Sequence, residues 1–484
     1  MKNIIRKTIA FLTAAVLAVT AAVVPVSAAN ETIKLPSNEA MSFVDSMGAG
    51  WNLGNAFDAA NCTWVSNELD YEKAWCGAKT TKELIKTVKD AGFRTIRVPV
   101  SYHDHVDSSL NISKAWLARV KEVIDWCLAE DLYVITNVHH DVLKGYYYPS
   151  SAEYKTSSNF MKKMWQQISA EFKDYGEKLI FETINEPRLV GTDLEWWYNT
   201  NSVPKEAADS LDCINRLNQE CVDTIRAAGG NNKTRYILVG GYDTDGTDKG
   251  ILSSYFKMPT DTVKNRLIAD VHFYGIGESA GHKTLDGLYK AFTSKGVPVV
   301  LTEYGLNSEG YKYFDNTDAA VNRMTDFASY ARARGMSVVF WDNNAGSKGV
   351  KGHKLIDRAT AKVVCPEIVK AFTTANKPAL ASDAKTSSAG TSSSTGTSYI
   401  KAKASVTKNT VKLSWDKVSG ATKYAVYMYR NGKYTCIASK VTANSYTVKK
   451  LTAGTKYKFF VRAYVNGKWT KTSQSKVTAA TTKK

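Results

Sequence analysis

Residues 179–187 read LIFETINEP, a short apolar run that ends in the polar residues Asn185 and Glu186. The bulky apolar residues of this run predict a buried strand with polar groups at its carboxyl end. Similar runs occur at 47–52, 95–100, 132–138, 236–240, 267–272, 297–302 and 337–341. Near-continuous apolar strands are typical of a parallel sheet, because such a sheet is covered on both faces.

Helical patterns separate these runs, at 81–91, 113–130, 160–175, 206–228, 285–294 and 319–334. After the fifth strand the best helical candidate is 251–256, and 366–372 closes the round. This alternation predicts the α/β class, with a (β/α)8 TIM barrel as the architecture. A doubly wound sheet would alternate in the same way, but no G-x-G-x-x-G segment follows a strand and no P-loop is present.

The net charge of +18 over 484 residues is unevenly placed. Residues 398–484 contain 19 lysines and arginines against one acidic residue, while the rest of the chain contains 45 basic and 45 acidic residues. The basic character therefore belongs to the last part and does not mark the first part as a nucleic-acid binder. Hydrophobic residues make up 44% of the chain, which excludes a disordered protein.

The N-terminus is typical of a secretory signal peptide. Lys2, Arg6 and Lys7 precede an apolar run at 9–24, and small residues at 26–28 offer a cleavage site. A membrane anchor is the alternative, but the run is short and lacks a charged stop on its far side. We therefore expect residues 1–28 to be removed and the protein to be secreted to the extracellular space.

The segment at 386–398, TSSAGTSSSTGTS, has no apolar residue larger than alanine and predicts a flexible linker. We expect a barrel at 29–376, a linker at 377–398 and a small all-β sandwich at 399–484. In that last part the runs VTKNTVKLSW, YAVYMYR, YTVKKL and YKFFVRAYV are strand-like.

The chain has seven cysteines, an odd number, and no C-x-x-C or zinc-like spacing. Cys62 and Cys76 lie in one irregular segment and could form a disulfide in an oxidising environment. The other five are predicted to be buried free thiols. No H-E-x-x-H motif or equivalent is present, so no metal is expected.

Polar and aromatic residues gather at the carboxyl ends of the predicted strands, where barrel enzymes place their active sites. The residues at these ends are Arg97, His139, His140, Asn185, Glu186, His272, Tyr274, Glu303 and Trp341. Glu186 and Glu303 suit the cleavage of an acetal, in which one carboxyl group donates a proton and the other attacks or directs water. The alternative is a pair of structural carboxylates, each bound to an arginine or a backbone amide.

The ordered series WNLGNAFDA (51–59), RTIRVPVS (94–101), NVHHD (137–141), TINEP (183–187), VHFYG (271–275), LTEYG (301–305) and FWDNN (340–344) resembles glycoside hydrolase family 5. This is the cellulase family of retaining barrel glycosidases, and the resemblance covers about 49–372. The last part resembles a fibronectin type III domain, in which Leu451 and Tyr457 match the tyrosine corner.

The resemblance to family 5 implies roles for individual residues. Glu186 would be the general acid/base and Glu303 the nucleophile. Asn185 would bind the sugar 2-hydroxyl, Arg97 would hold Glu303 ionised, and Tyr274 would donate a hydrogen bond to Glu303.

The resemblance also implies supporting residues. His272 would lie near Glu186, His139 would support the sugar at the cleavage point, and Trp341 would be its platform. His140 and Asn55 would also be substrate-binding. No cofactor is implied.

The predicted function is endo-acting hydrolysis of β-1,4-linked glucan: cellulose, mixed-linkage β-glucan or xyloglucan. Tryptophans and tyrosines at 64, 75, 146–148 and 196–198 suit an open cleft for several sugars, or they pack within their loops. The alternatives are a mannanase or xylanase on the same barrel, or a non-catalytic glycan-binding or wall-adhesion protein. The basic domain is either a spacer or contacts an anionic cell-wall or glycan surface, and we expect a monomer with no nucleic-acid partner.

Overall fold

The computed structural model describes residues 33–483, except 34, 276–277, 306–316, 345–352, 378–399, 417, 419–420, 431–432, 466–467, 471–474 and 477. The predicted signal peptide and nearly all of the predicted linker lie outside the described residues. The chain divides into two compact units, 1–384 and 385–484. The two units are described separately below.

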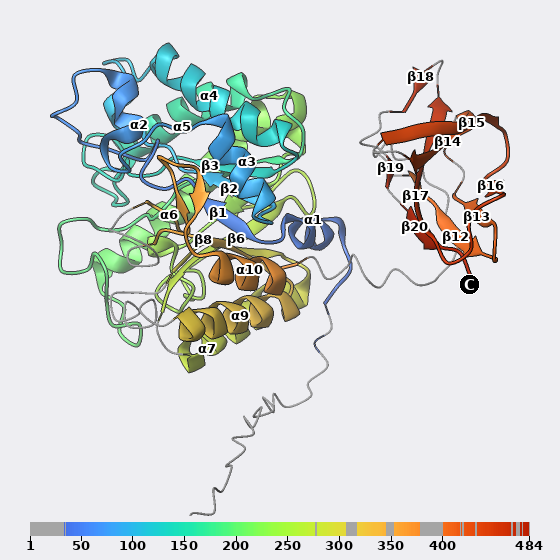
Figure 1. Cartoon of the computed structure of the whole chain (residues 1–484). Helices are drawn as coiled ribbons and strands as arrows, with labels where there is room; N and C mark the ends of the chain where they lie inside the picture. The colour runs from blue at the N-terminus through green and yellow to red at the C-terminus, as the bar shows by residue number, and fades with distance from the viewer. Residues whose placement is uncertain are drawn as a thin grey trace, which may run out of the picture. The chain divides into compact units, whose positions relative to one another are not determined.

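Eight parallel strands form a closed barrel in the first unit, as predicted (Figure 1). Each strand pairs with the next along the chain, and the first and last strands pair through Gly50 and Val339 to close the ring. The strands are β1 (Gly50–Asn52), β2 (Thr95–Val98), β3 (Tyr133–Asn137), β4 (Leu179–Glu182), β5 (Ile237–Val239), β6 (Leu267–Tyr274), β7 (Val299–Gly305) and β8 (Met336–Phe340).

Helices lie on the outside of the barrel (Figure 1). The main ones are α3 (Lys82–Asp90), α4 (Lys114–Ala129), α5 (Tyr154–Glu171), α6 (Lys205–Ala227), α7 (Glu278–Ala291), α9 (Thr317–Ala333) and α10 (Pro366–Ala375). Shorter elements are α2 (Tyr71–Ala74) and the 3-10 turns η1 (Glu68–Asp70), η2 (His103–His105), η3 (Gly230–Lys233), η4 (Tyr242–Thr244) and η5 (Thr293–Lys295). The helices predicted at 160–175 and 285–294 begin earlier than expected.

The helix predicted at 251–256 is wrong, because this segment consists of turns. The backbone N–H of Ile251 donates to the carbonyl of Asp245 at 2.9 Å, and Leu252 donates to Thr247 at 2.9 Å. Gly250 lies so close to Asp245 that a Cβ would be 2.1 Å from that carbonyl oxygen. After β5 the chain therefore forms tight turns where a helix was predicted.

The helix α1 (Glu39–Met47) was not predicted, and the strand expected from residue 47 begins only at Gly50. Asn38 caps this helix, since its side chain accepts a hydrogen bond from the N–H of Met41 at 2.9 Å. Phe43 stacks on Tyr236 with ring centroids 3.8 Å apart. The helix therefore packs its apolar face against one end of the barrel.

The barrel interior changes from apolar to polar along its axis. At the α1 end, inward-facing side chains of six strands form one apolar layer with α1: Ile135, Ile180, Leu238, Ile268, Val300 and Val339. Towards the carboxyl ends of the strands the buried inward-facing side chains are polar: Asn52, Arg97, Asn137, Glu182, Asp270 and Thr302. The apolar layer supports the fold, while the polar layer lies beneath the predicted site.

The second unit is all-β, as predicted, and its strands pair antiparallel except for β11 and β19, which pair parallel. Its strands are β11 (Ile400–Lys401), β12 (Lys403–Val406), β13 (Val411–Ser414), β14 (Ala421–Arg430), β15 (Lys433–Val441), β16 (Ser445–Val448), β17 (Lys456–Val465), β18 (Lys468–Trp469), β19 (Ser475–Lys476) and β20 (Thr478–Thr481). The hydroxyl of Tyr457 accepts a hydrogen bond from the N–H of Thr452 at 2.9 Å, which is the geometry of a tyrosine corner. The strands β11, β12, β15, β18, β19 and β20 were not predicted.

The proposed disulfide between Cys62 and Cys76 is not present, and both residues are buried free thiols. The Cys76 thiol is directed to the carbonyls of Glu72 and Ala78, each at 3.2 Å. The thiol of Cys62 lies 3.5 Å from the carbonyl of Ala60. Although the two cysteines share one loop, their sulfur atoms do not bond. The prediction that the other five cysteines are buried is wrong for Cys436, which is exposed.

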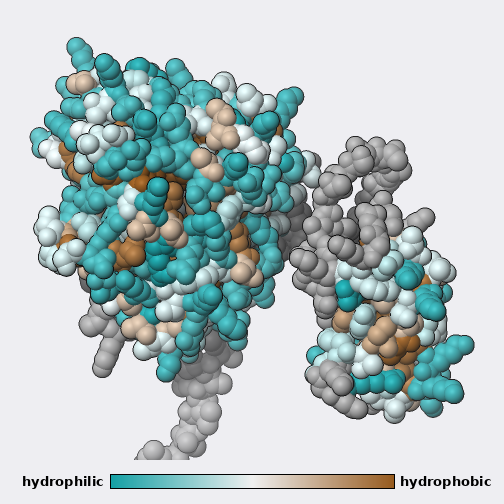
Figure 2. All heavy atoms as spheres, turned by 90° about the horizontal axis from the view of Figure 1, so that it is seen from above, coloured by the Kyte–Doolittle hydropathy of each residue, from teal (hydrophilic) through white to brown (hydrophobic). Residues whose placement is uncertain are grey.

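Hydrophilic side chains cover most of the face of the chain seen in Figure 2, and apolar side chains show there as separate patches. Within the described residues, the helices are all too short or too polar to cross a membrane.

Candidate active site

The alternation of side chains along β4 directs Glu182 into the barrel, below the site. In β4, Leu179 and Phe181 pack outwards against the helices, while Ile180 and Glu182 point into the barrel. Beyond the strand, Asn185 lies over the same interior, because its side-chain oxygen accepts a hydrogen bond from Arg97 at 2.7 Å. Glu186 follows at the mouth of the barrel, with its side chain 18% exposed.

A register shift between β7 and β8 turns Glu303 inwards. Val300 and Thr302 of β7 face the interior, so regular alternation would place residue 304 there next. The pairing of β7 with β8 shifts between Leu301 and Tyr304, and Tyr304 instead packs outwards, stacked on Phe327. Glu303 therefore faces the site. The pairing of β6 with β7 is also shifted, directly before His272.

Arg97 lies at the centre of the polar layer and is fully buried. Its guanidinium donates to both oxygens of Glu182 at 2.6 Å and to Oε1 of Glu303 at 2.7 Å. Burial lowers the pKa of Arg97, but the two carboxylates outweigh this effect and raise it. The guanidinium therefore stays charged and holds Glu303 in place, as predicted.

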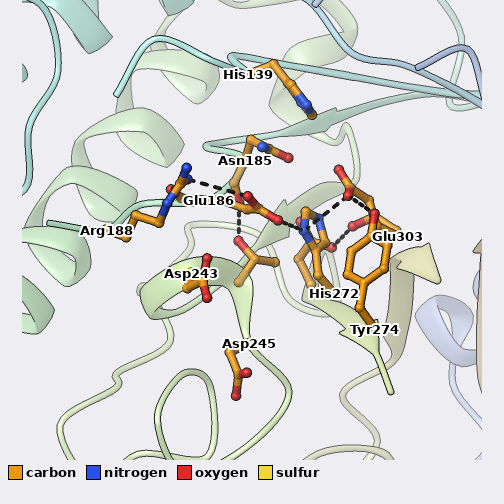
Figure 3. Close-up of polar contacts among 12 residues, drawn as sticks. His139, Asn185, Glu186, Arg188, Asp243, Asp245, His272, Tyr274 and Glu303 are labelled. Carbon is orange, nitrogen blue, oxygen red and sulfur yellow. Dashed lines mark hydrogen bonds and ion pairs between the residues drawn. The ribbon is translucent and has the colours of Figure 1, made fainter. Parts of the chain in front are cut away.

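Glu303 has a second donor in Tyr274 of β6, whose hydroxyl lies 2.5 Å from Oε2 (Figure 3). Burial and the charge of Glu303 raise the pKa of Tyr274 well above its ordinary value, so the hydroxyl keeps its proton. Two donors on the same carboxylate stabilise its ionised form. An ionised, oriented carboxylate is what a nucleophile at a sugar carbon requires.

Glu186 is in a different environment from Glu303. Its Oε1 lies 2.8 Å from Nδ1 of His272, and its Oε2 lies 3.4 Å from Nη1 of Arg188 (Figure 3). Burial raises the pKa of Glu186, although the charges of Arg188 and Arg97 act against this effect. A carboxyl group with a raised pKa can stay protonated near neutral pH and donate its proton.

The two carboxyl groups face one another across His272. One oxygen of Glu186, one oxygen of Glu303 and a ring nitrogen of His272 all lie within 4.8 Å of one another. Burial lowers the pKa of His272, so its ring is neutral. A small reacting group could therefore lie between a proton donor, Glu186, and an anion, Glu303.

His139 and Trp341 lie next to one another, and their predicted roles towards a sugar stay predictions. Nδ1 of His139 is 3.0 Å from the amide nitrogen of Asn137, and burial holds the pKa of His139 well below its ordinary value. The rings of His139 and Trp341 are parallel, with an angle of 5° and centroids 5.8 Å apart. The Trp341 ring lies against Gly54, where a Cβ would be 2.8 Å from it. Trp341 is half-buried and thus suits a sugar platform.

His140 and Asn55 belong to a neighbouring group around Asp58. Nε2 of His140 lies 3.8 Å from Oδ2 of Asp58, which also accepts a hydrogen bond from the N–H of Asn55 at 2.9 Å. The rings of His140 and Trp75 have centroids 5.6 Å apart. Neither predicted residue contacts Glu186 or Glu303 in the contacts that the structure gives, and their proposed role towards substrate stays a prediction.

The aromatic loops divide into two kinds. Tyr147, Tyr148 and Tyr198 are buried and pack within the protein, so for them the alternative of packing within the loops holds. The tryptophan side chains of these loops are instead exposed, namely Trp64, Trp75, Trp196 and Trp197.

Several residues of the site were not predicted. Glu182 and Asn137 anchor Arg97 and His139, and Arg188 contacts Glu186. The sequence contained features that could have indicated two of them: Glu182 is a charged residue at an inward position of an apolar strand, and Arg188 directly follows Pro187. A single sequence does not show which partner such a charged residue finds.

Three groups of histidine and carboxylate side chains among the described residues bring ligand atoms within 4.8 Å of one another. They are Asp58–His139–His140, Glu182–Asp270–His272 and Glu186–His272–Glu303. Most of these side chains already bond to the groups described above, such as Arg97, Asn137 and Tyr274. We assign none of them as metal ligands, and the expectation of no metal stays a prediction.

A closed barrel with two facing carboxyl groups at the carboxyl ends of its strands is the arrangement of a glycoside hydrolase. Residues 57–347 match the family model "Cellulase (glycosyl hydrolase family 5)", and residues 398–478 match the fibronectin type III domain. The chain therefore belongs to glycosyl hydrolase family 5 and has a C-terminal fibronectin type III domain.

Comparisons with individual proteins agree with this family. Endoglucanase A of Clostridium longisporum is 36% identical over 63% of this chain, and the match spans 59% of that relative's length. A mutant family 5 lichenase of Caldicellulosiruptor sp. F32, solved with cellotetraose, is 42% identical with a TM-score of 0.67 and covers 71% of this chain and 96% of its own. A family 5 xyloglucanase of Paenibacillus pabuli is 30% identical with a TM-score of 0.60, over 69% and 99% of the two chains.

Proposed function

We propose that this chain is a secreted endo-acting hydrolase of β-1,4-linked glucan that works with retention of anomeric configuration. The observation that carries the proposal is the short separation of the two carboxyl groups, with oxygens of Glu186 and Glu303 within 4.8 Å. Retaining enzymes place the two carboxyl groups about 5 Å apart, whereas inverting enzymes leave a gap of about 6.5–9.5 Å for a water molecule.

The first step would form a bond between Glu303 and the anomeric carbon of the sugar. Glu303 attacks this carbon while Glu186 gives its proton to the glycosidic oxygen, and the leaving chain departs with a new hydroxyl group. Asn185, held by Arg97, is placed to bind the 2-hydroxyl of the same sugar. Trp341 would stack on the sugar ring, since aromatic faces suit its apolar side.

The second step would hydrolyse the glycosyl-enzyme bond. Glu303 has lost its charge in the intermediate, so the pKa of Glu186 falls and the Glu186 carboxylate can accept a proton from water. The water oxygen bonds to the anomeric carbon, and Glu303 leaves as a carboxylate. Arg97 and Tyr274 would stabilise this departing charge because both already contact Glu303.

The relatives support a glucan substrate but differ in the polymer they are named for. One is called an endoglucanase, one a lichenase and one a xyloglucanase. We therefore propose cellulose, mixed-linkage β-glucan or xyloglucan as the substrate class. The second candidate, a mannanase or xylanase, keeps the same barrel and the same two carboxyl groups.

Reducing-sugar release from carboxymethyl-cellulose, barley β-glucan, xyloglucan, mannan and xylan tests the proposal. We expect release from one or more of the three glucans, and a loss of about 1,000-fold or more in Glu303→Gln, which keeps the size of the side chain but removes the nucleophile. Release mainly from mannan or xylan would favour the second candidate. Equal activity of Glu303→Gln and wild type would contradict the mechanism.

The finer proposals concern where the protein acts. We propose that residues 1–28 form a signal peptide and that residues 29–376 and 399–484 form the catalytic and fibronectin type III domains of the secreted monomer. The basic composition of residues 398–484 supports contact with an anionic glycan surface.

One sheet face of the second unit supports this contact. We define the aromatic–basic face by residues on the side of β14, β15, β17 and β18 opposite to the buried Val426 and Met428. It comprises Tyr427, Tyr429, Tyr434, Phe460, Tyr464 and Trp469, with Lys423 and Lys458. Aromatic groups suit pyranose rings and ammonium groups suit carboxylates, so we propose a uronic-acid-containing polysaccharide as the partner.

A further inference from the structure

The turn after β5 is bonded to the backbone on both sides of Glu186. The N–H of Asp243 donates to the carbonyl of Pro187 at 2.7 Å. The hydroxyl of Thr244 donates to the carbonyl of Asn185. Glu186 lies between these two acceptors in the chain, so the turn fixes the segment that carries its side chain.

This turn has an uncommon backbone conformation. Asp243 and Thr244 have φ values of 55° and 45°, in the left-handed region that most residues avoid. Two successive non-glycine residues of this kind are unfavourable unless the surroundings require them. The two hydrogen bonds to the Glu186 segment are one such requirement.

Asp243 and Lys249 form an ion pair beneath Glu186 (Figure 3 shows Asp243 and Glu186). Nζ of Lys249 lies 2.7 Å from Oδ2 of Asp243, and the two side chains are only 13% and 10% exposed. Nζ also donates to the carbonyl of Trp196 at 3.0 Å. The other oxygen of Asp243 is buried and has no hydrogen-bond partner among the described residues. The reaction steps above use neither residue.

The charged groups around Glu186 come from several elements. Arg97 of β2, Arg188 and Lys249 are cationic and favour an ionised Glu186, while Glu182 of β4 opposes ionisation. The environment also includes Glu303 of β7 and His272 of β6, which lie within 4.8 Å of it. Burial raises the pKa of Asp243 to about 7, and the charge of Glu186 contributes to this increase.

We propose that Asp243 and Lys249 are positioning residues for Glu186: the turn fixes its backbone, and the ion pair balances the charge around its carboxyl group. This inference rests on the proposed role of Glu186 as general acid. The charges of Arg97, Arg188 and Lys249 act on Glu186. Lys249 pairs with Asp243 at 2.7 Å and more distantly with Asp245 at 3.5 Å, so Asp243 is its nearer counter-charge. Without Asp243 the Lys249 charge would favour loss of the Glu186 proton, and without Lys249 the surroundings would favour its retention.

The test is the pH dependence of kcat/KM for a soluble β-glucan, with full-length wild type, Asp243→Asn, Lys249→Met and the double variant. The basic limb of this profile reports ionisation of the general acid in the free enzyme. We expect Asp243→Asn to move the basic limb to lower pH by about 0.5–1 unit, and Lys249→Met to move it to higher pH. In the double variant both charges of the ion pair are removed, so the basic limb should return towards that of wild type.

Asp248→Asn is the matched control, because Asp248 is exposed on the same turn and accepts a hydrogen bond from Thr200. It should leave the profile unchanged. Equal profiles for all variants, or shifts in the same direction for both single variants, would overturn the inference. A purely structural role would lower activity or thermal stability in both single variants without opposite shifts.

The failure of this inference differs from failure of the proposed function. An inactive wild type on every polymer, or full activity of Glu303→Gln, would remove the function itself. An active wild type whose basic limb does not respond to Asp243 or Lys249 would remove only the inference.

Discussion

At the scale of single residues, two chemically identical carboxyl groups have different contacts, and this difference supports the different tasks that we propose for them. Glu303 accepts hydrogen bonds from Arg97 and Tyr274, which favour the anion. Glu186 is near a neutral His272 and a more distant Arg188 at 3.4 Å, and burial raises its pKa. The environment therefore supports Glu303 as nucleophile and Glu186 as acid.

Removing the Tyr274 hydroxyl tests this division. We expect Tyr274→Phe to lower kcat on β-glucan by about 10- to 100-fold with little change in KM, because the hydroxyl orients Glu303 and stabilises its departing charge. Steady-state kinetics on soluble β-glucan measure both constants.

Tyr304→Phe is the matched control, since Tyr304 is fully buried one residue after Glu303 but faces away from the site. Its kcat should remain close to that of wild type. A Tyr274→Phe enzyme with unchanged kcat would contradict the assigned contact.

The residues that sequence alone indicated were those at the ends of predicted strands. Asn185, Glu186 and Glu303 could be predicted because a barrel brings the ends of its strands together. Arg188 and Asp243 could not, since their contacts with the Glu186 segment depend on how two loops fold. A charged residue in a loop has many possible partners, and its sequence position does not select one.

At the scale of secondary-structure elements, the eight strands and most barrel helices followed from hydrophobic pattern. The register shift that turns Glu303 inwards did not, because each alternating set of β7 residues mixes apolar and polar side chains and does not show where the register changes. The helix α1 was missed although Asn38 is a suitable N-cap, since the helix has only nine residues and its last residue, Met47, was assigned to the first strand. Tertiary contact with Tyr236 determines that helix more than its own sequence does.

The sequence pattern predicts even less about the loops. The aromatic triplets at 146–148 and 196–198 look alike in sequence, yet Tyr147, Tyr148 and Tyr198 are buried while Trp196 and Trp197 are exposed. The direction of each loop, and not its composition, determines which rings remain available to a substrate. Arg188 lies 4.1 Å from the Trp196 ring, so this loop is also in contact with a neighbour of Glu186.

At the scale of the whole molecule, the two units differ in charge, and we propose different tasks for them. The barrel part of the chain is electrically balanced, and residues 398–484 carry the excess of positive charge. We expect Lys423→Glu combined with Lys458→Glu to weaken binding of the full chain to immobilised polygalacturonate by about 10-fold at low salt. Hydrolysis of soluble β-glucan should not change.

Lys403→Glu is the control for this prediction, because Lys403 is exposed on β12, in the other sheet of the same unit. Affinity electrophoresis at two salt concentrations measures the effect, and binding of the wild type should weaken as salt increases. Equal losses for the control and the paired variant would assign binding to net charge and not to the aromatic–basic face.

Glu186 and Glu303 lie close enough to support double displacement at one carbon. Proton NMR of cellohexaose hydrolysis by the full chain tests it directly, by observing the first reducing ends formed before mutarotation. We predict that β-anomers appear first and that α-anomers grow in only later, because two displacements at one carbon retain its configuration. First appearance of α-anomers would show inversion and would contradict the assignment of Glu303 as nucleophile.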